Sequence, residues 1–142
     1  MKSLTVIFTV TCFAACGFAG DKSPLPPATP IPQGAREIGI AETEALIHDQ
    51  KDIAILDVRT PDEFQKQGHL PGAKHLDFFR EDFDKLVLTI GIDLKKPCIV
   101  YCAIGGRAKR AADKMAKLGF REILIPKGCF NAWRAAGKVV EK

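Results

Sequence analysis

The sequence predicts an α/β fold in which helices cover both faces of a parallel sheet, giving three layers. Short apolar runs alternate with helical patterns along the chain, and this alternation is typical of parallel strands joined by crossover helices. The run 53–58 is apolar except for Asp57 near its end, as expected of a strand buried on both faces. The run 99–102 leads through two glycines directly into a helical pattern. A chain of 142 residues has room for one such domain.

Five strands and five helices are expected to alternate. The strands are residues 36–38, 53–58, 73–76, 99–102 and 122–125, with the first at an edge and the fourth at the centre. The helices are residues 41–48, 61–67, 81–88, 108–118 and 128–136. The second helix has the clearest ends, because Thr60 can cap it, Pro61 suits its first turn and Gly68 suits its end.

The first 19 residues are expected to be a signal peptide. A lysine at position 2 precedes the apolar stretch 4–15, which is too short to span a bilayer and suits a signal-peptide core. The sequence Phe-Ala-Ala-Cys at 13–16 resembles a bacterial lipobox, in which Cys16 would become lipidated. Ordinary secretion with cleavage after Ala19 and an uncleaved anchor are the alternatives. All three export the domain, as a periplasmic protein or a membrane-anchored lipoprotein.

A proline-rich linker is expected over residues 20–35, before a domain at 36–140. The linker holds five of the nine prolines of the chain. Proline at this density favours an extended, polyproline-type spacer over a helix or a paired strand.

Cys102 is the candidate catalytic residue. It ends the strand 99–102, where ligands bind in parallel sheets, and a short loop leads from it into a helix. Backbone N–H groups in such a turn form an anion-binding nest, which lowers a thiol pKa and favours a thiolate nucleophile. Arg107 adds a full positive charge. The residues expected to bind the substrate are those of the loop: Ala103, Ile104, Gly105, Gly106 and Arg107.

The spacing from Cys102 to Arg107 separates two chemistries. A cysteine phosphatase needs five residues between its Cys and Arg, so that the loop encloses a tetrahedral phosphate. Four residues lie between them here. The shorter loop is too tight for a phosphoryl group but has room for one extra sulfur on the thiolate. A phosphatase or arsenate reductase is therefore the less favoured alternative.

Three motifs, in the right order over residues 35–140, resemble the rhodanese homology domain. They are Leu-Asp-Val-Arg-Thr-Pro-Asp-Glu-Phe at 56–64 followed by Gly-His-Leu-Pro-Gly-Ala at 68–73, the loop 102–107, and Phe-Asn-Ala-Trp at 130–133. The loop is similar to the six-residue active-site loop of the sulfurtransferase members. The resemblance implies that Cys102 takes sulfane sulfur from a small-molecule donor such as thiosulfate, holds it as a persulfide, and passes it to a thiol or cyanide. A membrane-anchored sulfur-carrier or redox-partner module with little turnover of its own is the alternative.

Asp57, Arg59 and Glu63 are expected to brace the loops around the site. A carboxylate at the end of a buried strand needs partners, and Arg59 with Glu63 is the pair suggested across the turn. His69 is expected to be a structural, hydrogen-bonded histidine rather than a general base for Cys102. Five aromatic side chains are expected mainly in the core: Phe78, Phe79, Phe83, Phe130 and Trp133. For the first three, a place in the wall of the substrate pocket is the alternative.

The residue before Phe130 departs from the family pattern. The family usually has a Gly-Gly pair where this chain has Gly128 and Cys129, and this position lies near the active-site rim in the family. Cys129 is therefore expected to place a second thiol near Cys102 and to form a reversible disulfide that protects or switches off the enzyme. The alternative is a small residue tolerated where glycine would do. Cys98 is expected to be buried and inert.

Composition and charge fit a small soluble enzyme. The net charge of +4 includes no block of like charges, and no basic run with interleaved aromatic residues suggests nucleic-acid binding. No two cysteines have the two-residue spacing of a zinc knuckle, so neither a zinc site nor a disulfide framework is expected. No cofactor is expected. Lys109 and Arg110 beside Arg107 fit a solvated helix face as well as they fit substrate steering.

Overall fold

A computed structural model describes residues 30–50 and 52–142 of the chain. The predicted signal peptide, its Cys16 and most of the linker lie outside this part. The sheet has the order β1-β5-β4-β2-β3, and all neighbouring strands are parallel. The strands are β1 (Ala35–Ile38), β2 (Ala54–Asp57), β3 (Lys74–His75), β4 (Cys98–Tyr101) and β5 (Ile123–Pro126). The helices are α1 (Ile40–Asp49), α2 (Pro61–Gln67), α3 (Phe83–Thr89), α4 (Gly106–Lys117) and α5 (Cys129–Ala135).

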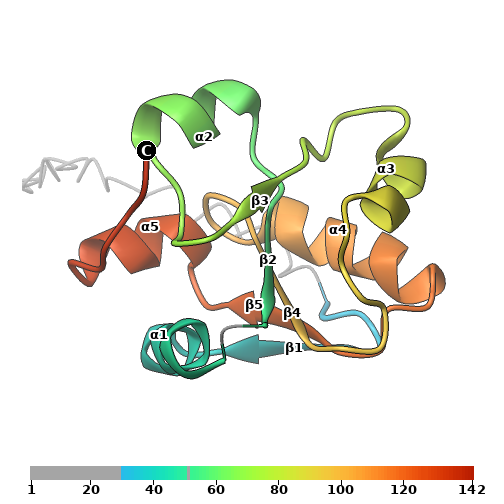
Figure 1. The fold of residues 1–142 in the computed structure, drawn as a ribbon, viewed down its shortest axis with the longest axis horizontal. Coiled ribbons are helices and arrows are strands. Elements are labelled where there is room, and N and C mark those ends of the chain that lie inside the picture. The colour runs from blue at the N-terminus through green and yellow to red at the C-terminus, as the bar shows by residue number, and fades with distance from the viewer. Residues whose placement is uncertain (1–29, 51) are drawn as a thin grey trace, which may run out of the picture.

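The helices form the two outer layers. Figure 1 shows α1 and α5 on one side of the sheet and α3 and α4 on the other, while α2 follows the carboxyl end of β2. The predicted α/β fold with a five-stranded parallel sheet is confirmed, and each element begins and ends within two residues of the expected position. In the part of the chain that the structure describes, no helix is long and apolar enough to cross a membrane.

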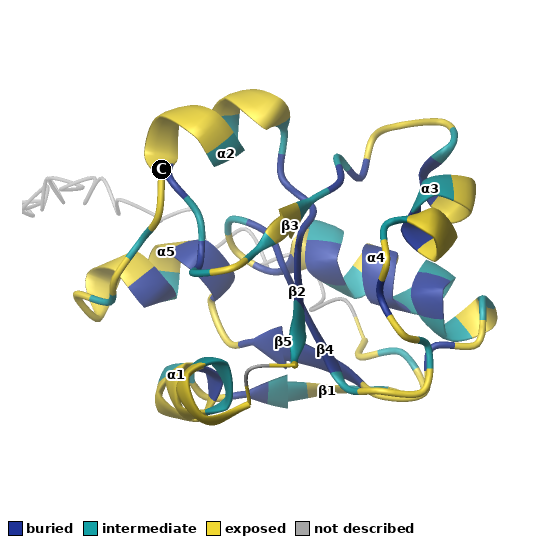
Figure 2. Cartoon of the chain, in the orientation of Figure 1, coloured by how far each residue is buried: buried dark blue, intermediate teal, exposed yellow. Residues whose placement is uncertain are grey.

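The core lies on both faces of the central strands. Every residue of β4 and β5 is buried, and Figure 2 shows this burial continuing onto the inner face of α4. That face carries Met115 and three alanines, whose small side chains let the helix approach the sheet closely: Ala108, Ala111 and Ala112. By contrast α2 buries none of its residues. A capping box in which Thr60 and Glu63 exchange hydrogen bonds supports its first turn.

A buried ion pair joins Asp57 to Arg59 at the end of β2. Both side chains are fully buried, and Arg59 donates three hydrogen bonds to the Asp57 carboxylate at 2.6–3.0 Å. Arg59 Nη2 also donates to the Gly68 carbonyl at 2.6 Å, and its Cζ lies 3.8 Å from the centre of the Phe130 ring. The expected pairing of Arg59 with Glu63 is therefore wrong. The nearer and fully buried carboxylate takes the arginine, because a buried charge needs a matched partner.

The buried pair should be a large contributor to stability. We expect Asp57→Asn to lower the free energy of unfolding by about 3–5 kcal/mol, because the Arg59 charge would remain buried without its counter-charge. Urea unfolding measures the change. Asp62→Asn is the matched control. Among the described residues Asp62 pairs only with Lys66, on the exposed side of α2, and loss of this pair should leave stability nearly unchanged. Equal unfolding midpoints for the two variants would contradict the role given to the Asp57 carboxylate.

Candidate active site

Cys102 directly follows β4, the middle strand of the sheet, and is 1% exposed. The chain then turns through a short loop, and α4 begins at Gly106. The Gly105 N–H donates a hydrogen bond to Cys102 Sγ at 3.1 Å. Gly105 has a φ of 119°, a conformation that residues with a side chain rarely adopt, so glycine suits this turn. The loop after Cys102 and the first turn of α4 thus place backbone N–H donors around the Cys102 sulfur.

These surroundings make Cys102 a thiolate at neutral pH, since they lower its pKa to about 5. The largest cause is a hydrogen bond from the Cys129 thiol. The backbone N–H groups of Ala108, Gly105 and Ile104 also lower this pKa, and together these donors outweigh the opposing effect of burial. The Ala108 donor was not among the predicted residues, although the first N–H groups of any helix lack partners within the helix and this one could have been expected.

The two other cysteines of the described chain keep their protons. The hydrogen bond to the Cys102 thiolate and burial both raise the pKa of Cys129, so this thiol is the donor and Cys102 the acceptor. Burial in β4 raises the pKa of Cys98 to about 12. Of the three sulfurs, Cys102 alone is suited to nucleophilic attack at neutral pH.

The remaining loop residues surround Cys102 in different ways. The Ala103 carbonyl accepts a hydrogen bond from the Asn131 N–H at 3.0 Å, which ties the loop to α5. Ile104 is 72% exposed, and Gly106 is exposed as well, so the outer side of the loop is open to solvent. Arg107 is partly buried.

Arg107 lies between a carboxylate and the reactive sulfur. Its guanidinium donates two hydrogen bonds to Glu63 at 2.7 and 2.8 Å. Hydrogen bonds from Arg107 and Thr60 lower the pKa of Glu63 to about 2, so this carboxylate is charged at neutral pH. The pKa of Arg107 is raised first by Glu63 and further by the nearby Cys102 thiolate. Glu63 therefore braces the site through Arg107, a partner that the sequence did not indicate.

The other predicted residues lie in or around the core. The His69 ring stacks on Phe64, with 4.0 Å between ring centres, and its Nδ1 is 3.1 Å from the Leu70 carbonyl oxygen. Four of the five aromatic side chains expected in the core are buried: Phe78, Phe83, Phe130 and Trp133. The expectation is wrong for Phe79, which is 63% exposed and lies 6.0 Å from the Arg107 guanidinium, at the edge of the site.

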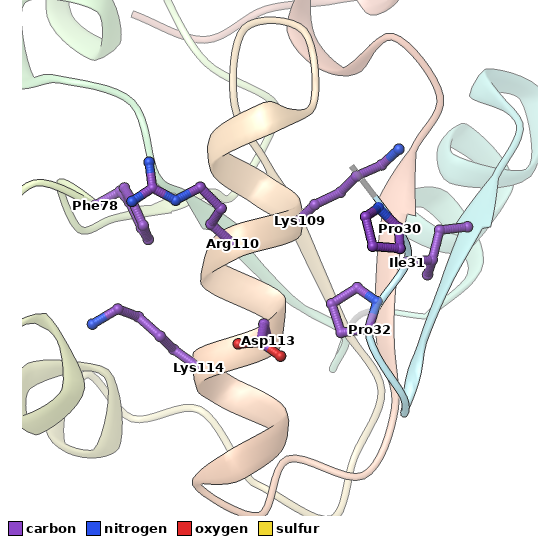
Figure 3. A pocket seen from close by; sticks show the side chains of 8 residues that line it. All are labelled: Pro30, Ile31, Pro32, Phe78, Lys109, Arg110, Asp113 and Lys114. Carbon is purple, nitrogen blue, oxygen red and sulfur yellow. The ribbon is translucent and has the colours of Figure 1, made fainter. Parts of the chain in front are cut away.

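A groove of about 320 Å³ runs beside α4, away from the reactive sulfur. Figure 3 shows Lys109 and Asp113 facing a proline-containing segment on one side of the helix, with Arg110 and Lys114 on the other. Lys109 lies 3.0 Å from Glu37, and the Arg110 guanidinium lies 4.9 Å from the Phe78 ring centre. These cations have local partners.

Within residues 30–50 and 52–142, no cluster of three or more His, Cys, Asp or Glu side chains could hold a metal ion.

A low-pKa thiol held by backbone donors at the end of a central parallel strand defines an α/β protein with a cysteine suited to nucleophilic attack. The chain belongs to the rhodanese-like domain family, whose model matches residues 40–136. It is 30% identical over 87 residues to the thiosulfate sulfurtransferase GlpE of Coxiella burnetii, covering 61% of this chain and 76% of that protein. The protein of the same name from Ectopseudomonas mendocina is 37% identical over 82 residues, with coverages of 57% and 70%.

The fold also matches solved structures. The solution structure of the polysulfide-sulfur transferase homodimer of Wolinella succinogenes superposes with a TM-score of 0.64 at 26% identity. The match covers 76% of this chain and 79% of that one. The family resemblance that the motifs indicated is confirmed.

The pKa of Cys102 should lie far below that of an ordinary thiol. We expect its alkylation rate by iodoacetamide to rise with pH about a midpoint near 5, because the thiolate is the reactive form. Cys129→Gly should move the midpoint upward, since it removes the largest cause of the lowered pKa. Cys98→Ala is the control and should leave the midpoint unchanged. A midpoint near 9.0, the ordinary value for a cysteine thiol, in the wild type would contradict the described surroundings.

Proposed function

We propose that this chain takes sulfane sulfur from a small anionic donor such as thiosulfate, holds it as a persulfide on Cys102, and passes it to a thiol or cyanide. The observation that carries the proposal is the Cys102 thiolate, buried and surrounded by backbone N–H groups. The family and its members named thiosulfate sulfurtransferase, at 30–37% identity, support a rhodanese-type sulfurtransferase.

The reaction has two displacement steps. In the first, the Cys102 thiolate attacks the outer sulfur of thiosulfate, the S–S bond of the donor breaks, and sulfite leaves with the electron pair. The added sulfur then carries the negative charge, and the N–H groups of the loop are positioned to stabilise it. In the second step the acceptor attacks this outer sulfur and Cys102 leaves as a thiolate. Because its pKa is low, Cys102 is a good leaving group, and at neutral pH it is also present mainly as the nucleophilic thiolate.

Arg107 contributes a fixed positive charge. Both of its hydrogen-bonded Nη atoms already contact Glu63, so the guanidinium is held in place before the donor arrives. A charge held beside the thiolate stabilises the anionic donor without the cost of ordering a free side chain. The exposed side chains of Phe79 and Ile104 lie at the edge of the site and are available to contact a donor or an acceptor.

The proposal includes export of the domain. The apolar segment 4–15 and the lipobox-like sequence ending at Cys16 support a periplasmic or membrane-anchored location. Fractionation of the full chain and of its Cys16→Ser variant tests lipid anchoring, and a chain that remains in the cytoplasm would contradict this part of the proposal.

Thiosulfate should load one sulfur onto Cys102. We expect a transient or stable mass increase of about 32 Da, located on Cys102 by peptide mapping and removed by cyanide as thiocyanate. Cys102→Ser should take up no sulfur and release no sulfite. Steady-state release of thiocyanate distinguishes an enzyme from a carrier module, which would load sulfur without repeated turnover. Sulfur uptake by Cys102→Ser would overturn the assignment of the nucleophile.

Arg107 should affect the rate at which thiosulfate transfers sulfur to Cys102. We expect Arg107→Ala to slow sulfite release from thiosulfate roughly ten- to hundredfold, the equivalent of one charge-assisted interaction. Arg110→Ala removes a positive charge from the next turn of α4, where the guanidinium packs on Phe78, and should leave the rate nearly unchanged. Equal rates for the wild type and the Arg107→Ala variant would show that the backbone donors suffice.

A further inference from the structure

Cys129 is a buried thiol beside the reactive sulfur, and the sulfur-transfer steps described above do not use it as a nucleophile. Both cysteines are 1% exposed. The Phe130 N–H donates to the Cys102 carbonyl and the Asn131 N–H to the Ala103 carbonyl, both at 3.0 Å, so two hydrogen bonds join the backbones around the two cysteines. Gly105 lies against both sulfurs: its N–H is 3.1 Å from Cys102 Sγ, and a Cβ built on it would lie 3.9 Å from Cys129 Sγ.

The backbone of Cys129 is strained. Its φ is 48°, and no other non-glycine residue in residues 30–50 or 52–142 has a positive φ. Glycine adopts this conformation freely, whereas a residue with a Cβ pays about 1–2 kcal/mol. Strain of this kind is characteristic of functional sites. The thiol is thus held against Cys102 at a cost to folding that a glycine would avoid.

We propose that Cys129 is a second nucleophile that resolves the Cys102 persulfide, so that the pair reduces sulfane sulfur to sulfide. The inference rests on the proposed function, which supplies the persulfide. It assigns the pair a reductive reaction in addition to sulfur transfer to an external acceptor.

The step is an internal thiol–disulfide exchange. The Cys129 proton moves to the outer sulfur of the persulfide, and the resulting Cys129 thiolate attacks Cys102 Sγ. The bond between Cys102 Sγ and the outer sulfur breaks, and hydrosulfide leaves with the electron pair. The two cysteine sulfurs lose two electrons as their disulfide forms, and the sulfane sulfur gains both. A single turnover needs no further oxidant, whereas a second turnover needs an external dithiol to reduce the disulfide.

Before sulfur is loaded onto Cys102, Cys129 stays protonated and cannot act as a nucleophile. While Cys102 is a thiolate, Cys129 retains its proton, because its contact with that charge and its burial raise its pKa. Sulfur loading moves the negative charge outward by one atom, so the charge that held the proton on Cys129 leaves Cys102 Sγ. Cys98 cannot replace Cys129, since it lies at the opposite end of β4 from Cys102.

A single-turnover experiment tests the inference. Fully reduced protein, freed of reductant under anaerobic conditions, receives one equivalent of thiosulfate and no acceptor. We expect one sulfite and one sulfide per protein, and a product about 2 Da lighter than the reduced chain, with a disulfide linking residues 102 and 129. Cys129→Gly removes the thiol while suiting the positive φ, and should release sulfite only and keep a stable adduct of about 32 Da. Cys98→Ala should behave as the wild type does.

The outcomes separate this inference from the proposed function. A wild-type protein that releases sulfite and keeps the adduct, as Cys129→Gly should, would overturn the inference and leave sulfur transfer intact. A wild-type protein that releases no sulfite would overturn the proposed function itself. A disulfide that forms equally well without thiosulfate, or one that involves Cys98, would also overturn the inference. Release of sulfide with the 102–129 disulfide, dependent on Cys129, would establish it.

Discussion

The buried guanidinium of Arg59 holds together the segments on which the active site depends. It binds Asp57 at the end of β2 and the Gly68 carbonyl at the end of α2, and it packs on the Phe130 ring in α5. A buried charge is tolerated only while its partners stay in place, so these three segments cannot separate without a large energetic cost. Glu63 is carried by α2 and Cys129 by α5. The geometry around the reactive sulfur therefore depends on an arginine outside the active-site loop.

Two chemically identical side chains at this site hold opposite protonation states. The N–H groups of the loop and of the first turn of α4 point toward Cys102, and these donors favour a negative sulfur there. Cys129 has the thiolate as its neighbour instead and retains the proton. The asymmetry comes from the backbone. Redistribution of charge within the pair can therefore change which sulfur is the nucleophile without movement of the chain.

The elements that the sequence predicts correctly are those specified by short stretches of neighbouring residues. Apolar runs, helix caps and the loop after Cys102 are contained within a few neighbouring residues, and the elements that they predict are present. The contacts missed depend on distant parts of the chain. Glu63 and Arg107 are 44 positions apart, and several acidic residues could have paired with Arg59. Phe79 follows Phe78 in a segment without regular periodicity, so no sequence pattern indicated which ring would enter the core.

The weakly packed helix α2 has a consequence for the dynamics of the site. It buries none of its residues, yet its Glu63 both caps the helix and holds the Arg107 guanidinium. Local unfolding of such a helix requires less free energy than opening of the sheet. Unfolding of its first turn alone, with the Gly68 end still bound to Arg59, would withdraw the Glu63 carboxylate and release the Arg107 guanidinium. The electrostatics around Cys102 therefore depend on the local stability of one surface helix as well as on the loop 102–107.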